Sequence, residues 1–157
     1  MKNILLVIPG SRRSDRAIEY AVKTAKKEGA TLYALYILDR AVAEEALERF
    51  SDVGFIGDKP STQLSEAIMK ESRQRGYEEL GKVQIRAMEE GVDFEPLMEE
   101  GNFIDIIKKT IEKYSIELII TIRKKITTLR RYFSPSILDE LKEQVPCRVE
   151  IFDEEEV

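Results

Sequence analysis

The stretch NILLVIPGSRRSDRAIEYAVKTAKKEGATLYALYIL, residues 3–38, carries the pattern that decides the fold. Its two ends, Asn3–Ile8 and Thr31–Leu38, are apolar runs of the kind found in strands buried on both faces of a parallel sheet. Between them apolar residues recur at helical spacing, with Ser14 as a candidate N-cap and Gly29 as a candidate helix-ending residue. The stretch therefore predicts one right-handed βαβ unit with parallel strands.

The rest of the chain continues this alternation. We expect further strands at residues 92–99, 116–122 and 147–152, the first of them nearer an edge because Pro96 has no amide hydrogen to donate. We expect helices at residues 41–50, 62–90, 103–114 and 136–144, and a loop at residues 51–61. This order predicts an α/β fold, a doubly wound five-stranded mostly parallel sheet with helices on both faces in three layers.

The organisation along the chain indicates a single domain over residues 1–157. It includes a longer α/loop region at residues 40–76 and an acidic tail, residues 153–157, which we interpret as a solvated end. The candidate buried positions of the long helix are Leu64, Ile68, Leu80, Val83, Ile85 and Met88. Gly76 and Gly81 weaken that helix, so a kink or break there stays an open alternative.

Composition narrows the classes of function. The chain has 157 residues, 43% apolar and 35% charged, with a net charge of −5, which is globular and argues against nucleic-acid binding. No apolar run is long enough for a membrane span, and the N-terminus lacks the features of a signal peptide, so we expect a cytoplasmic protein. The absence of histidine excludes Ser-His-Asp and Cys-His catalysis and histidine-containing metal sites. The single cysteine, Cys147, is interpreted as a small buried hydrophobe.

Several local patterns, taken in order, resemble the universal stress protein family. Gly10-Ser11 is followed by Ser14-Asp15-Arg16-Ala17, Gly101-Asn102 precedes an Ile-rich helix, and Val145-Pro146-Cys147 precedes the last strand. The resemblance covers nearly the whole chain except for residues 39–76. It implies a Rossmann-like fold of the adenine nucleotide alpha hydrolase type, a role in stress response, and a homodimer paired through the last strand.

Nucleotide-binding members of that family carry Gly-2x-Gly-9x-Gly-Ser/Thr after the fourth strand. Here these positions fall on Ile122, Lys125, Pro135 and Ser136, and the family's aspartate after the first strand falls on Pro9. Gly10, Ser11 and Ser136 fit the family's site, and Ile37 resembles its apolar adenine-lining position. Glycine adopts backbone conformations in which amides converge on phosphate, and Ile and Lys adopt those conformations only with strain. We therefore expect that ATP is not bound in the usual family manner.

Seven basic residues follow the first and fourth strands, whose carboxyl ends should meet at the ligand crevice of a doubly wound sheet. They are Arg12, Arg13, Arg123, Lys124, Lys125, Arg130 and Arg131. One interpretation is an anion site built from Arg and Lys side chains, with hydroxyls from Ser11, Ser134 and Ser136. The alternative interpretation is a solvated loop whose charges pair with nearby acids.

The sequence as a whole predicts a non-catalytic regulatory or stress-response module, homodimeric through residues 147–152. A switch that binds a nucleotide or another phosphorylated anion, including ATP, is the alternative, and an acidic protein surface is a further candidate partner. An enzymatic role ranks lower because no residue set suggests catalysis or a metal site. Nucleic-acid binding ranks lower because the net charge is negative. No resident cofactor is predicted.

Overall fold

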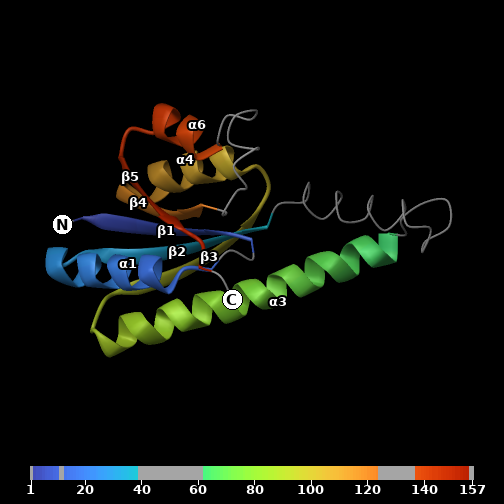
Figure 1. Cartoon of the computed structure of the whole chain (residues 1–157), viewed down its shortest axis with the longest axis horizontal. Coiled ribbons are helices and arrows are strands. Elements are labelled where there is room, and N and C mark those ends of the chain that lie inside the picture. Colours follow the sequence, from blue (N-terminus) through green and yellow to red (C-terminus); the bar gives the residue numbers. More distant parts are fainter. Residues whose placement is uncertain (1, 11–12, 39–61, 124–136, 156–157) are drawn as a thin grey trace.

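The computed structural model describes residues 2–10, 13–38, 62–123 and 137–155. These residues form one five-stranded, all-parallel sheet in the order β3-β2-β1-β4-β5 (Figure 1). The strands are β1 (Asn3–Pro9), β2 (Thr31–Leu38), β3 (Phe94–Glu100), β4 (Ile116–Arg123) and β5 (Arg148–Asp153). The predicted α/β fold is confirmed, with β3 at one edge as expected.

Helices cover both faces of the sheet. On one face lie α1 (Asp15–Glu28) and α3 (Thr62–Glu89), and on the other lie α4 (Phe103–Tyr114) and α6 (Ile137–Gln144). The helix expected at residues 41–50, the loop expected at residues 51–61 and the first residue of the helix expected at residues 136–144 lie outside the described residues.

The central strand β1 divides its side chains between two cores. Ile4, Leu6 and Ile8 face α1 and α3, whereas Leu5 and Val7 face α4 and α6. All five are at most 1% exposed. This alternation is what makes the strand apolar along its whole length, because neither face meets water.

The two capping signals predicted for α1, Ser14 and Gly29, are confirmed. Ser14 caps α1, its side-chain oxygen accepting a hydrogen bond from the amide of Ala17 at 3.1 Å. Asn102 caps α4 in the same way, accepting from the amide of Asp105 at 3.1 Å. Gly29 ends α1 with φ of 62°, the left-handed conformation that glycine adopts without strain.

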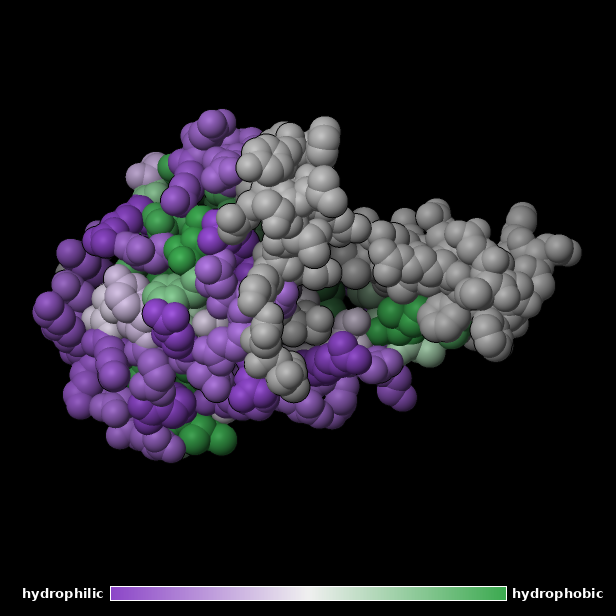
Figure 2. All heavy atoms as spheres, viewed as in Figure 1, coloured by the Kyte–Doolittle hydropathy of each residue, from purple (hydrophilic) through white to green (hydrophobic). Residues whose placement is uncertain are grey.

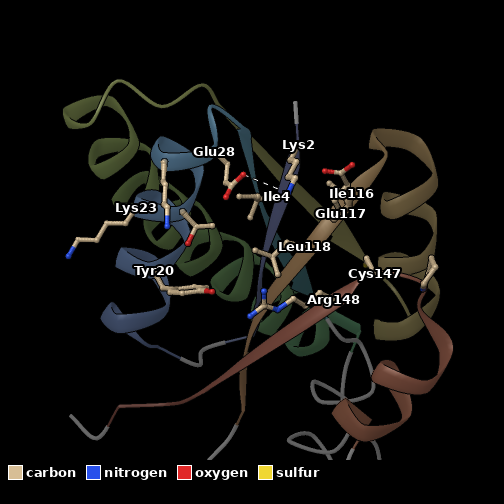
Figure 3. Close-up of a pocket in the computed structure, with 13 residues that line it drawn as sticks. Lys2, Ile4, Tyr20, Lys23, Glu28, Ile116, Glu117, Leu118, Cys147 and Arg148 are labelled. Carbon is tan, nitrogen blue, oxygen red and sulfur yellow. Dashed lines mark ion pairs between the residues drawn. The ribbon is translucent and has the colours of Figure 1, made fainter.

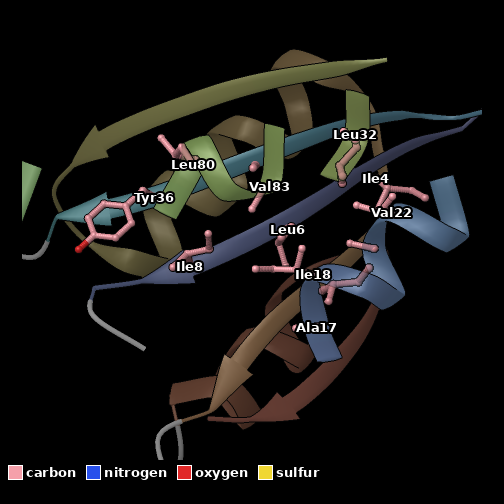
Figure 4. Close-up of a cluster of buried hydrophobic side chains, with 14 of the residues drawn as sticks. Ile4, Leu6, Ile8, Ala17, Ile18, Val22, Leu32, Tyr36, Leu80 and Val83 are labelled. Carbon is pink, nitrogen blue, oxygen red and sulfur yellow. The ribbon is translucent and has the colours of Figure 1, made fainter. Parts of the chain in front are cut away.

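Helix α3 is continuous through Gly76 and Gly81, so the alternative of a break is excluded. Leu80 and Val83 are buried as predicted (Figure 4), but Ile85 and Met88 are 59% and 70% exposed. The prediction for those two was wrong because the helix places a different set against the sheet. The buried positions at heptad-like spacing are Met69, Leu80, Val83 and Ala87, together with the close approach at Gly76.

A charged contact fixes α3 against α1 outside the apolar core. The guanidinium of Arg86 reaches both carboxylate oxygens of Glu19, Nε to Oε1 at 2.5 Å and Nη2 to Oε2 at 2.9 Å. Bidentate pairing of this kind is geometrically specific. The hydrogen bonds from Arg86 lower the pKa of Glu19, so the pair stays ionised at neutral pH.

At Gly76 the backbone of α3 packs closely against side chains of the sheet. A Cβ added there would lie 2.6 Å from Cδ1 of the buried Tyr36 and 2.6 Å from Cε of Met98. We expect Gly76→Ala to lower the free energy of unfolding by about 1–3 kcal/mol, as overpacking does. Urea denaturation followed by circular dichroism measures the change.

Gly81 provides the matched control on the same helix. A Cβ added there meets no atom within 4 Å. We expect Gly81→Ala to raise the free energy of unfolding by about 0.5–1 kcal/mol, the ordinary helix-propensity gain. Effects of the same sign and size at both glycines would contradict the close packing at Gly76.

Candidate binding site at the carboxyl ends of β1 and β4

The pairing of β1 with β4 creates the switch point of the sheet. Val7 lies opposite Thr121 in the ladder, and the Thr121 hydroxyl donates to the Val7 carbonyl at 3.3 Å. The chain leaves β1 toward α1 on one face, whereas α6, the next described helix after β4, lies on the opposite face. In open α/β sheets ligands bind beyond the carboxyl ends of such a strand pair.

Half of the predicted site residues lie in the described part of the chain, around this switch point. They are Pro9, Gly10, Arg13, Ile37, Ile122 and Arg123, which we call the rim. The other six predicted site residues lie outside the described residues: Ser11, Arg12, Lys124, Lys125, Ser134 and Ser136. The same holds for Arg130 and Arg131, so the predicted cluster of seven positive charges is represented by Arg13 and Arg123 alone.

Pro9, Gly10 and Ile37 lie together where β1 and β2 end. Pro9 is opposite Ile37 in the ladder, and the Gly10 amide donates to the Ile37 carbonyl at 3.3 Å. Gly10 has φ of 64°, which places the turn in the left-handed region. The Ile37 side chain is 2% exposed and packs in the core beside α4 and α6, so it lines that core.

Ile122 is the residue that the sequence resemblance aligns with the first of the family's glycine positions. It is paired with Phe152 in the β4–β5 ladder and is 1% exposed, in the core beside α1 and α3. Its side chain therefore lies on the opposite face of the sheet from that of Ile37. At this position the chain is a regular strand with a core side chain, which is unlike the start of a glycine loop.

Arg123 ends β4 and holds a carboxylate of the next strand. Its Nε and Nη2 lie 2.9 Å and 2.7 Å from Oδ1 of Asp153, the last residue of β5. One residue further, the amide of Glu154 donates to the Arg123 carbonyl at 2.8 Å. These contacts carry the chain past the end of the sheet and along the rim.

The acidic tail then reaches the start of α1, which differs from its interpretation as a solvated end. The Glu155 amide donates to the Arg13 carbonyl at 2.8 Å, and the Glu155 carboxylate accepts from the Arg16 amide at 3.1 Å. The amides in the first turn of a helix favour negative charge, which explains the position of that carboxylate. The sequence signal that could have revealed this contact is the proximity of four acidic residues to the end of β5.

Arg13 sits in an acidic setting. Its Nη2 lies 3.3 Å from Oδ2 of Asp15, and this hydrogen bond is the main cause that raises the pKa of Arg13. The charge of Glu155 adds to that increase to a lesser extent. Arg13 and Arg123 are thus each close to carboxylates of the protein itself.

A separate groove of about 890 Å³ opens at the other end of the same strands (Figure 3). It lies at the amino ends of β1 and β4, between α1 and β5, where Leu118 and Tyr20 form part of its wall and Lys2 pairs with Glu28 at 3.7 Å. None of the described predicted site residues lines this groove, whereas Cys147, which was interpreted as a buried hydrophobe, does.

Cys147 is half-buried on that groove, less buried than predicted. Burial raises the pKa of its thiol, so the thiolate that would react is disfavoured. Among the described residues no cluster of acidic or sulfur side chains is arranged to hold a metal ion. The described helices also include none that is long and apolar enough to cross a membrane, and the surface visible in Figure 2 is mainly hydrophilic.

The order of elements, the switch point and the Ser14 cap agree with the resemblance seen in the sequence. The sequence profile of the Universal stress protein family matches residues 1–152. The chain belongs to this family.

Individual relatives support the assignment. A universal stress protein of Methanocaldococcus jannaschii is 28% identical over 148 residues, which cover 94% of this chain and 79% of that protein. The structure of a universal stress protein from Lactobacillus plantarum is similar with a TM-score of 0.69 and 17% identity, covering 96% of this chain and 97% of that one. A universal stress protein solved in complex with cAMP gives a TM-score of 0.63 at 15% identity, covering 98% of each chain.

Proposed function

We propose that this universal stress protein is a non-catalytic regulatory module that works in the cytoplasm as a homodimer paired through β5. The observation that carries the dimer is the edge position of β5. In the described sheet it pairs with β4 alone, so its other edge offers a row of backbone donors and acceptors. Exposed edges of this kind are templates for pairing with a second chain.

The side chains of β5 favour antiparallel pairing of two copies about an axis through Val149. In that register Arg148 of one chain lies opposite Glu150 of the partner subunit, and the second such pair follows by symmetry. Opposite charges directly across antiparallel strands stabilise their pairing, and like charges destabilise it. Within one chain Arg148 and Glu150 already form an ion pair, so both side chains lie on the same face of β5.

Charge reversal tests this register. Arg148→Glu and Glu150→Arg each place like charges across both pairs, and we expect each variant alone to dimerise more weakly than the original chain. An equimolar mixture of the two variants restores opposite charges between chains but keeps like charges within each chain. Size-exclusion chromatography with light scattering should therefore show dimers in the mixture at concentrations where each variant is mostly monomeric.

The mixture separates pairing between chains from stability within a chain. If it dimerises no better than the single variants, this register is wrong. If the original chain is a monomer at every concentration measured, pairing through β5 is wrong altogether.

A second candidate function, binding of a phosphorylated anion at the rim, is supported by the carboxylates already bound there. Two nitrogen atoms of Arg123 contact the Asp153 carboxylate, and the Arg16 amide in the first turn of α1 donates to the Glu155 carboxylate. Guanidinium groups and helix N-termini bind phosphate through the same interactions. A relative of the same fold is known in complex with cAMP. Since Ile122 is a core residue of a strand, such binding here would depend on side-chain cations more than on a glycine loop.

Titration with inorganic pyrophosphate, monitored by thermal unfolding, tests this candidate. A ligand at 100 times its dissociation constant adds roughly 2.7 kcal/mol of stability, so a rising melting temperature is expected at millimolar pyrophosphate. Arg123→Gln should remove most of the increase. Lys109→Gln, which removes a positive charge from an exposed position of α4, is the control and should leave it unchanged. No increase in the original chain, or an equal loss in both variants, would contradict a defined site at Arg123.

A further inference from the structure

The described part of the acidic tail crosses the rim from one side to the other. Asp153 is held by Arg123 at the end of β4, the Glu154 amide extends the ladder to the Arg123 carbonyl, and Glu155 bonds to Arg13 and Arg16 at the start of α1. The contact between Arg16 and Glu155 joins residues that are 139 apart in sequence. The tail therefore connects the end of β4 with the start of α1 at the switch point.

The tail also uses the groups that an incoming anion would need. The Arg16 amide lies in the first turn of α1, where amides have no acceptor within the helix, and it donates to the Glu155 carboxylate. The Arg123 guanidinium donates to Asp153. Each carboxylate also reduces the positive potential of the rim, because unlike charges a few ångströms apart largely cancel at longer range. A phosphate group at either of these donors would compete with the carboxylate that is bound there.

We propose that residues 153–155 are an intramolecular competitor of the rim, an autoinhibitory strap that an anionic ligand must displace before it binds. This inference rests on the anion site proposed above, and it adds the regulation of that site. The strap is anchored at its start by Phe152, whose ring lies 5.3 Å from that of Tyr20 on α1. Beyond Phe152 it is held by hydrogen bonds and an exposed ion pair, which release more easily than buried apolar contacts.

The size of the effect follows from the population of the docked strap. When only a fraction of the molecules has the site open, the apparent dissociation constant rises by the inverse of that fraction. A strap that is docked nine times out of ten therefore weakens binding roughly tenfold. The effect should also fall with rising salt, because exposed charges are screened.

Glu155→Ala tests the proposal, since it removes the carboxylate from the start of α1 and leaves the rest of the rim intact. The matched control is Glu143→Ala, which removes one negative charge from an exposed position of α6 on the opposite face of the sheet. Binding of inorganic pyrophosphate to the full-length chain is measured by isothermal titration calorimetry at low and at moderate salt. Hydrogen exchange of the Arg16 amide is followed in the same three proteins.

We expect pyrophosphate to bind Glu155→Ala roughly three- to thirty-fold more tightly than the original chain or Glu143→Ala, with the difference shrinking at higher salt. The Arg16 amide should exchange faster in Glu155→Ala alone. Equal affinity in all three proteins would overturn the strap while the anion site stands. Absence of binding in all three would overturn the anion site, and the strap as its regulator with it. Unchanged exchange at Arg16 would show that the tail is not docked in solution.

Discussion

The parallel pairing of β1 with β4 is the constraint on which the rest of this structure depends. It joins strands that are far apart in sequence, as the hydrogen bond between Thr121 and Val7 shows, and it places β1 at the centre of the sheet. A central strand needs apolar side chains on both faces, which is why residues 4–8 are buried without exception. The same pairing places the end of β4 beside the end of β1, from which the chain continues into α1, so it also decides where the candidate site lies.

The side-chain charges at the ends of β1 and β4, Arg13 and Arg123, have a consequence that a glycine loop would not have. Backbone amides arranged by glycines carry no net charge, so they attract the protein's own carboxylates only weakly when no ligand is bound. Side-chain cations attract nearby carboxylates, and here Arg123 contacts Asp153 at the start of the chain's own tail, whereas Arg13 contacts Asp15. Residues 153–155 therefore contact both Arg123 and the first turn of α1 at this end of the sheet.

Much of the fold could be predicted from the sequence because its signals are local. Ser14 and Asn102 cap helices through their own side chains, Gly29 ends α1, and Pro96 marks an edge strand. The phase of α3 could not be predicted as well, because Gly76 looks like a weakness in the sequence and acts as a contact in the structure. Without knowing that the helix approaches the sheet at Gly76, Ile85 and Met88 read as core positions.

For the candidate site, the sequence predicts the position of the residues in the sheet better than it predicts their contacts. Pro9, Gly10 and Arg123 were placed correctly at the ends of their strands because strand order alone puts them there. The docking of Glu155 at α1 depends on where β5 ends relative to β4, a register that no local pattern encodes. Whether Lys124, Lys125 and Ser136 complete the site stays a prediction.

A nuclear magnetic resonance titration of the full-length, ¹⁵N-labelled chain with inorganic pyrophosphate tests the central claim most directly. The account predicts that the largest changes occur at the amides of Arg16, Glu154 and Glu155, and that the tail amides move toward the positions of an unstructured chain as the ligand displaces them. Changes concentrated at Lys2 and Lys23, which line the groove at the opposite end of the strands, would contradict it. So would a spectrum that does not change at all.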